Sequence, residues 1–238
     1  EVRLHQFKLP AVTAFTRHNR IDRQVLGDPV APLGIISTGK SYLDVRRALV
    51  EIGIDESRAK ALGVKLYKVG MPWPLEPDGL RDFAKGTRKL ILVEEKRGLM
   101  EEQVRNLLYG VTDSPEVIGK TDETGAVLFQ VYGRLDAAQI ATAIGDRLVD
   151  LTHDDTLIGA LKHLRARSEK ADLKEAPMRR TPYFCAGCPH NTSTLVPEGS
   201  RALAGIGCHY MAQWMDRETA TFTQMGGEGA SWIGESPF

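Results

Sequence analysis

LGIISTGKS, at residues 33–41, is the stretch of sequence that decides the fold. Its first part is a short apolar run that ends in glycine, which is typical of a buried strand followed by a turn. Ser41 can cap a following helix. The apolar residues of that helix recur at helical spacing and are Leu43, Val45, Leu49 and Ile52. The stretch therefore predicts a strand, a turn and a helix.

The same alternation continues along the chain. We expect strands at 64–69, 89–94 and 116–120, and helices at 78–85, 100–108 and 136–151. Strands that alternate with helices require parallel crossovers, which predict an α/β fold with a doubly wound, mainly parallel sheet. We assign this domain to residues 33–152. The charged run EEKR that follows the third strand is expected to be surface charge.

The flanking segments differ from this domain in composition. Residues 1–32 have little periodicity and several prolines, so we expect an extended linker from an upstream domain. Residues 153–179 are charged and helical in period at first, then dense in Lys, Glu and Asp, and are expected to form a solvated, charged connector between domains. Residues 180–238 hold all three cysteines and a cluster of Gly and Pro, which predicts a second unit dominated by loops around a site.

The overall charge excludes several classes of function. Lys plus Arg and Asp plus Glu number 31 each in 238 residues, so there is no basic surplus to bind nucleic acid or an anionic membrane.

No apolar run approaches the ~18 residues that span a bilayer, and we expect a cytoplasmic protein. An odd number of cysteines, all after residue 184, favours metal or redox chemistry over a disulfide framework.

The cysteines form a recognisable pattern. Cys185 and Cys188 make a C-x-x-C turn, and Cys208 follows later in the sequence GIGC. Small residues inside such a turn let two sulfurs converge on one centre, which suits an iron–sulfur cluster as well as zinc.

Four other interpretations of the cysteines compete. Attachment of c-type haem needs a histidine directly after the second cysteine, but Pro189 intervenes before His190. A thioredoxin-like dithiol belongs between a strand and a helix early in its domain, a position that Cys188-Pro189 does not match. Structural zinc with the cysteines and His190 or His209 has the right ligand types, and unligated buried cysteines also remain open.

Two glycine-containing motifs suggest phosphate binding. MGGEG at 225–229 could cradle a phosphate, with Glu228 serving a hard cation, although a tight turn is the simpler interpretation. GIISTGKS at 34–41 matches the bare P-loop pattern. Ile35 and Ile36 look like the body of the strand, however, which leaves a loop too short to wrap a phosphate.

Three segments of the second unit carry a family resemblance. RTPYFCAGCPHNTST at 180–194, PEGSRALAGIGCHYMA at 197–212 and FTQMGGEG at 222–229 closely resemble the start of the thiamine-diphosphate-binding domain in long, fused indolepyruvate:ferredoxin oxidoreductases. The preceding unit, with ISTGK at 36–40 and LVEEKR at 92–97, looks like the transketolase C-terminal-like domain of that family. The chain resembles an internal fragment of such an enzyme, and we expect it to be inactive alone.

The resemblance implies a large cytoplasmic enzyme, assembled as a homo-oligomer. Such an enzyme oxidatively decarboxylates an aryl 2-oxoacid on thiamine diphosphate, passes electrons through 4Fe-4S clusters to ferredoxin, and transfers the acyl group to coenzyme A. The resemblance also implies that Cys185, Cys188 and Cys208 are three of four cluster ligands, and that the segment Ile206, Gly207, Cys208 and His209 binds thiamine.

Two elements of the family pattern are missing from the chain. A fourth cysteine and the Gly-Asp-Gly motif that holds Mg²⁺ and the diphosphate are not found in the sequence, so we expect those ligands elsewhere. Two alternative functions remain open at this stage. One is a zinc-stabilised interaction module, and the other is a nucleotide-binding α/β protein that uses the turn from Gly34 to Ser41.

Overall fold

The structure is a computed structural model that describes residues 1–172 and 180–238. The chain divides into two units, residues 1–174 and 175–238. Each unit is described by itself.

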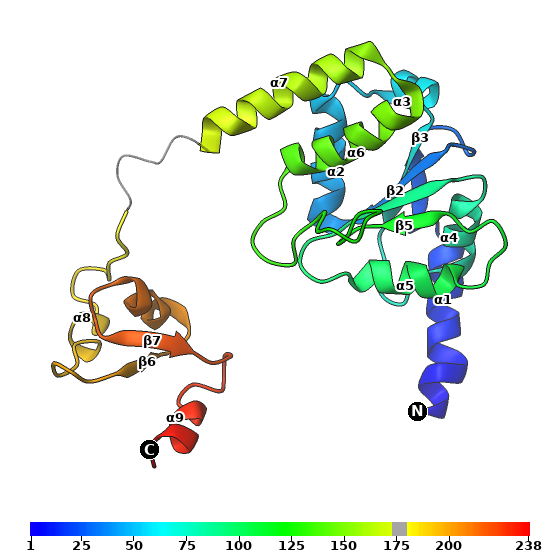
Figure 1. The fold of residues 1–238 in the computed structure, drawn as a ribbon. Helices are drawn as coiled ribbons and strands as arrows, with labels where there is room; N and C mark the ends of the chain where they lie inside the picture. The colour runs from blue at the N-terminus through cyan, green and yellow to red at the C-terminus, as the bar shows by residue number, and fades with distance from the viewer. Residues whose placement is uncertain (173–179) are drawn as a thin grey trace. The chain divides into compact units, whose positions relative to one another are not determined.

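The first unit is built on a five-stranded sheet with the order β1-β3-β2-β4-β5 (Figure 1). The strands are β1 (Arg23–Leu26), β2 (Leu33–Thr38), β3 (Val64–Val69), β4 (Lys89–Val93) and β5 (Glu116–Ile118). Only β1 is antiparallel to its neighbour, and the other pairs are parallel. The expected doubly wound, mainly parallel α/β sheet is therefore confirmed.

Helices cover both faces of this sheet. One face carries α2 (Gly39–Glu51), α3 (Glu56–Leu62), α6 (Ala137–Thr152) and α7 (Asp155–Asp172). The other carries α4 (Pro77–Ala84) and α5 (Leu99–Leu108). Successive strand side chains point to opposite faces, so Ile35 joins the first core and Ile36 the second. A strand buried on both sides reads as a continuous apolar run, which is why β2 was visible in the sequence.

The central strand also explains the glycine at position 34. A Cβ atom at Gly34 would lie 2.6 Å from Leu90 Cδ2 and 3.1 Å from Phe83 Cε1. The glycine is therefore required because β4 and α4 pack closely against β2.

The helix after β2 differs in detail from the expectation. Helix α2 begins at Gly39, with Thr38 at its N-cap position, so Ser41 lies inside the first turn and does not cap it. Val45, Leu49 and Ile52 are buried as expected, but Leu43 is 64% exposed. The apolar spacing therefore predicted the buried face of α2 correctly, except that Leu43 lies on the exposed face.

The expected extended linker over residues 1–32 is wrong. A π-helical turn, η1 (Leu4–Lys8), continues into helix α1 (Leu9–His18). Strand β1 pairs with the edge of β3 that faces away from β2. Pro10 is the second residue of α1, directly after the π-helical turn η1. Arg17 at the end of α1 pairs with Glu76 and Asp82, which holds α1 against α4.

The expected solvated connector over residues 153–179 is only partly correct. Its first part is helix α7, which buries Leu157, Leu161 and Leu164 in the core that it shares with α6. Asp154 accepts a hydrogen bond from Leu157 N at 2.8 Å and caps the helix. The helical period expected at the start of this segment is therefore present, but the helix packs on the core where a solvated connector was expected. The rest of the connector, residues 173–179, lies outside the described residues.

The second unit contains short elements joined by loops. They are α8 (His190–Ser193), β6 (Ala202–Ala204), the 3₁₀ helix η2 (Gly207–Trp214), β7 (Thr219–Phe222) and α9 (Ala230–Glu235). β6 and β7 pair in parallel (Figure 1). The ring of Tyr210 packs edge-on against Trp214 and Phe222, with centroids 5.0 and 4.8 Å away. These aromatic contacts fasten η2 to the small sheet.

Across the part of the chain that the structure describes, none of the helices has the length and apolar character needed to cross a membrane.

Candidate functional site

The C-x-x-C motif forms a closed turn. Cys188 N donates a hydrogen bond to Cys185 O at 3.0 Å, and Gly187 has a φ of +75°. A β-turn whose third residue is left-handed favours glycine at that position, because glycine adopts a positive φ without steric cost. The turn therefore places both cysteines on one tight loop, directly before α8.

Side chains from neighbouring segments hold this turn. Asn191 Nδ2 donates to Cys185 O at 3.0 Å, and Arg217 Nη1 donates to Asn191 O at 3.1 Å. Asn191 thus connects the first cysteine to the segment before β7. The position of the turn is set by these contacts as well as by its own backbone.

His190 contacts one of the cysteines directly. Its Nδ1 atom lies 3.2 Å from Cys188 Sγ. The imidazole stacks on the buried Phe184, with ring centroids 5.2 Å apart and an interplanar angle of 25°. The aromatic contact fixes the plane of the imidazole, and the nitrogen is aimed at the sulfur.

The third cysteine lies at the start of η2, next to His209. His209 Nδ1 accepts a hydrogen bond from Gly205 N at 2.6 Å, which orients the ring. The His209 ring centroid is 5.8 Å from that of His190. The segment that carries Cys208 therefore packs beside the segment that carries Cys188, through their two histidines.

The cysteines are all free thiols. Cys185 and Cys208 are exposed and Cys188 is partly buried. The interpretation of buried, unligated cysteines is thus wrong about their burial. Within residues 1–172 and 180–238, no three or more His, Cys, Asp or Glu side chains are grouped so that they could hold a metal ion. The structure shows the donors on adjacent segments, and the ligand set implied by the resemblance stays a prediction.

The comparison with protein families adds a decisive observation. The family described as "Indolepyruvate oxidoreductase domain" matches residues 23–172, which is more than half of the chain. The chain belongs to this family.

Curated relatives carry the same family name. "Indolepyruvate oxidoreductase subunit IorA" of Pyrococcus abyssi is 26% identical over 231 residues, 94% of this chain and 33% of the relative. The protein of that name in Pyrococcus horikoshii is 28% identical over 84% of this chain and 29% of its own length. The one in Archaeoglobus fulgidus is 29% identical over 74% and 26%. The chain therefore spans at most about a third of these relatives.

Solved structures give weaker matches. One is "2-oxoglutarate:ferredoxin oxidoreductase from Magnetococcus marinus with 2-oxoglutarate, coenzyme A and succinyl-CoA bound", with a TM-score of 0.37, 16% identity, and coverage of 59% of this chain and 23% of that one. Another is "Split gene transketolase, inactive beta4 tetramer", with a TM-score of 0.36, 18% identity, and coverage of 54% and 42%. Scores this low support no argument, and the fold class rests on the sheet itself.

The residues predicted to contact thiamine lie on one short segment of this chain. Ile206 is half-buried and precedes η2, and Gly207 is exposed with a φ of +78°. His209 is half-buried and oriented by Gly205. Their role remains a prediction.

In the P-loop-like turn from Gly34 to Ser41, the lysine and the first glycine both make contacts within the protein. Lys40 Nζ pairs with Asp44 and, at 3.1 Å, with Glu95, and these hydrogen bonds raise the pKa of Lys40. Gly34 is explained by packing against Leu90 and Phe83. The lysine is therefore held by carboxylates, and the first glycine serves the core.

The glycine-rich segment near the C-terminal end is a turn closed on itself. Gly227 N donates to Gln224 O at 2.9 Å, and Gly226 N donates to Glu228 Oε2 at 2.8 Å. The tight turn is confirmed. Glu228 uses its carboxylate to cap this turn, which weakens it as a candidate for a cation.

The expected surface charge at EEKR is only partly correct. Glu94 is buried and accepts hydrogen bonds from Met100 N and Glu101 N, both at 2.9 Å, so it caps α5. Burial raises the pKa of Glu94. Glu94 lies five residues before Leu99, the first residue of α5, so the usual spacing of a helix cap did not indicate this role.

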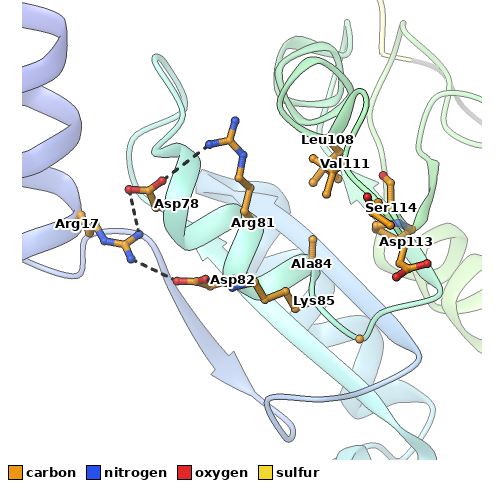
Figure 2. Close-up of a pocket in the computed structure, with 13 residues that line it drawn as sticks. Arg17, Asp78, Arg81, Asp82, Ala84, Lys85, Leu108, Val111, Asp113 and Ser114 are labelled. Atoms are coloured by element: carbon orange, nitrogen blue, oxygen red, sulfur yellow. Dashed lines mark hydrogen bonds and ion pairs between the residues drawn. The ribbon is translucent and has the colours of Figure 1, made fainter.

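A cavity of about 540 Å³ lies in the first unit, between the end of α4 and the loop after α5. Figure 2 shows the residues that line it. Three cations line it, and each pairs with an aspartate. Arg17 lies 3.3 Å from Asp82, Lys85 lies 2.9 Å from Asp82, and Arg81 lies 3.8 Å from Asp78. Because its charges are already matched, we assign no ligand to this cavity.

Proposed function

We propose that this chain is part of an enzyme that oxidatively decarboxylates an aryl 2-oxoacid of the indolepyruvate type to an acyl-CoA. In this proposal thiamine diphosphate with Mg²⁺ and a 4Fe-4S cluster are the cofactors, and ferredoxin receives the electrons. Support comes from the family match over residues 23–172 and from the names of the relatives. The relatives are about three times as long, so the activity belongs to a larger protein.

The single observation that carries the proposal is the packing of the two cysteine segments. The His190–His209 contact brings the segment of Cys208 beside the turn of Cys185 and Cys188. Thiolates are the ligands of 4Fe-4S clusters, so the donors have the right chemistry. Cys185 and Cys208 are exposed and Cys188 is partly buried, so none of the three thiols is sealed in the core.

Each residue would then have a defined part. Cys185, Cys188 and Cys208 would hold the cluster, and Asn191 would keep the turn in place through Cys185 O. Ile206, Gly207 and His209 would contact thiamine diphosphate, immediately next to a cluster ligand in the chain. When bound, thiamine diphosphate supplies the electron sink for decarboxylation and the cluster supplies an electron acceptor.

The alternative of a zinc module uses the same donors. Zinc binds Cys and His in tetrahedral sites, and His190 and His209 both lie close to the cysteine segments. Zinc is not redox-active, whereas thiolate-bound iron absorbs visible light and can be reduced.

This difference gives the test. The protein that contains this chain is purified without oxygen from cells grown with iron and zinc. We expect a brown protein with iron and inorganic sulfide in equal amounts, visible absorption that bleaches with dithionite, and thiamine diphosphate in the extract. A colourless protein with stoichiometric zinc and no iron would overturn the proposal.

A further inference from the structure

One side of the N-terminal helical segment is apolar and exposed. Across η1 and α1, Phe7, Ala11 and Phe15 recur every four residues and therefore lie on one face. The side chains of Phe7 and Phe15 are 64% and 60% exposed, and Ala11 is exposed as well. Large apolar side chains that line up along a helix are typical of a face that packs against protein.

The opposite side of the same segment already has a partner. Leu9 and Thr13 are partly buried, and Thr16 is buried and donates from Oγ1 to Met71 Sδ at 3.2 Å. Figure 1 shows that the N-terminal half of the segment stands clear of the sheet and of the other helices of the first unit. A helix of this length is marginal in water without tertiary contacts, so the exposed face needs a packing partner.

The charge around the exposed face decides which partner fits. Residues 1–20 contain four Lys and Arg side chains and one acidic side chain. Arg17 pairs with acidic residues of α4, whereas Arg3 and Lys8 have no acidic partner in the part of the chain that the structure describes. A second copy of the helix carries the same basic side chains, so a pair of such helices would juxtapose like charges. An apolar surface with acidic residues beside it is complementary.

The lengths of the relatives indicate where such a surface comes from. The match with the relative from Pyrococcus abyssi covers 94% of this chain but 33% of the relative, so most of that protein lies outside the match. A segment of the same polypeptide is held near the helix at a high effective concentration. It therefore has an advantage over a separate protein or a membrane surface.

We infer that the face formed by Phe7, Ala11 and Phe15 is a docking surface for a segment of the longer protein that lies outside residues 1–238. The segment presents an apolar face that packs between the two rings, where the small side chain of Ala11 permits close approach. Acidic side chains flank that face and pair with the basic side chains beside the stripe. The inference does not depend on what the cysteines bind.

Photo-cross-linking in cells that express the complete protein tests this surface. The photoreactive residue p-benzoylphenylalanine replaces Phe7 or Phe15, one at a time, and keeps the exposed face aromatic. After irradiation and digestion, mass spectrometry identifies the peptide that is joined to the helix. We expect both positions to cross-link to one segment outside residues 1–238. The same reporter at Thr13, on the inner side, should not reach that segment.

A charge reversal tests the acidic flank of the docked segment. With the reporter at Phe15, Lys8→Glu should lower the yield of the cross-link by about two- to fivefold, the range expected for loss of a surface ion pair. Lys8→Gln should lower it less, because it removes the attraction without adding repulsion. Lys162→Glu, at an exposed position of α7, is the matched control and should leave the yield unchanged. Equal yields in Lys8→Glu and Lys162→Glu would contradict the acidic flank.

The identity of the cross-linked partner separates the alternatives. A cross-link to residues 1–20 would mean that a second copy of the helix covers the face. A cross-link to lipid would mean a membrane surface, and one to a different protein would mean a separate partner. Each of these results would overturn the inference, as would cross-links confined to residues 21–238 or the absence of any cross-link at Phe7 and Phe15.

Discussion

The imidazole rings of His190 and His209 lie 5.8 Å apart, centroid to centroid. One ring contacts the sulfur of Cys188, and the other belongs to the residue directly after Cys208. This pair is the link between two cysteine segments that are 20 residues apart in the sequence, counting from Cys188 to Cys208. The second unit therefore has its donors on neighbouring loops.

Substitution of His209 should loosen that link. His209→Ala removes the acceptor of Gly205 N, and an unpaired, partly buried N–H costs about 1–3 kcal/mol. We expect lower iron retention after gel filtration of the complete protein, measured by iron analysis. His163→Ala, far from the cysteines in sequence and exposed, should retain wild-type iron. Equal retention in both variants would speak against the link.

The turn between the first two cysteines should depend on the left-handed conformation of Gly187. Open space surrounds the position where a Cβ would lie, so Gly187→Ala is penalised only through its φ of +75°, by about 1–2 kcal/mol. Gly187→Asn should cost less, because asparagine tolerates this conformation better. The measurement is the rate of cluster reconstitution with iron and sulfide, with the order wild type, Asn, Ala. Faster loading of Ala than of Asn would contradict this account.

The fold of the first unit was largely predictable, because its buried strands are continuous apolar runs. The strands at 64–69 and 89–93 and the helices over 99–108 and 137–152 follow the expected positions closely. Helix α3 was missed because it is short and charged, and β1 because an edge strand of mixed polarity has no distinct pattern. Helix α1 was missed because its apolar side chains, such as Val12 and Phe15, are exposed and form no clear buried face, and because the prolines within residues 1–32 suggested a linker.

The candidate site was predictable in its cysteines but not in its contacts. The spacing of Cys185 and Cys188 predicts a turn, and the turn is present. Nothing in the spacing indicates that His190 and His209 would meet, because that contact depends on how η2 packs on the loop before it. Likewise, Asn191 holds Cys185 O through a contact that only the folded backbone creates.

Glu76 should be a main stabiliser of α4. It is 4% exposed, accepts hydrogen bonds from Asp78 N at 2.9 Å and Gly79 N at 2.7 Å, and lies 3.5 Å from Arg17 Nη1. Glu76→Ala should lower the free energy of unfolding by about 1–2 kcal/mol, the usual cost of a lost helix cap. The measurement is urea denaturation followed by circular dichroism.

The control for that variant lies two residues further on. Asp78 also faces Arg17, at 3.7 Å, but it is 61% exposed, and surface ion pairs contribute below about 1 kcal/mol. Asp78→Ala should therefore destabilise the unit less than Glu76→Ala. The reverse order would mean that the ion pair, and not the cap, holds α1 and α4 together.

Because of Lys65, the free energy of unfolding of the first unit should rise at alkaline pH. It is fully buried on β3, its Nζ donates to Pro29 O at 2.7 Å, and burial lowers its pKa from 10.5 to about 8. Below pH 8 the lysine is protonated in both states. Between about pH 8 and 10.5 the unfolded state holds more protons, so the free energy of unfolding increases with pH, by up to about 3 kcal/mol in total.

A comparison with Lys65→Met isolates this effect from other titrations. Lys65→Met should be less stable at neutral pH, because Pro29 O loses its donor, but its stability should lack the rise between pH 8 and 10.5. Lys68→Met, on the same strand and partly exposed, should keep the rise. Parallel pH profiles for wild type and Lys65→Met would show that Lys65 titrates normally.

The central claim is that Cys185, Cys188 and Cys208 ligate one cluster, and Mössbauer spectroscopy of the complete, ⁵⁷Fe-loaded protein tests it most directly. We expect a 4Fe-4S spectrum in the wild type, and loss or conversion of the same cluster's signal when any one of the three cysteines is changed to serine. Spectra that stay unchanged in all three variants, or a wild type that binds zinc and no iron, would contradict the account.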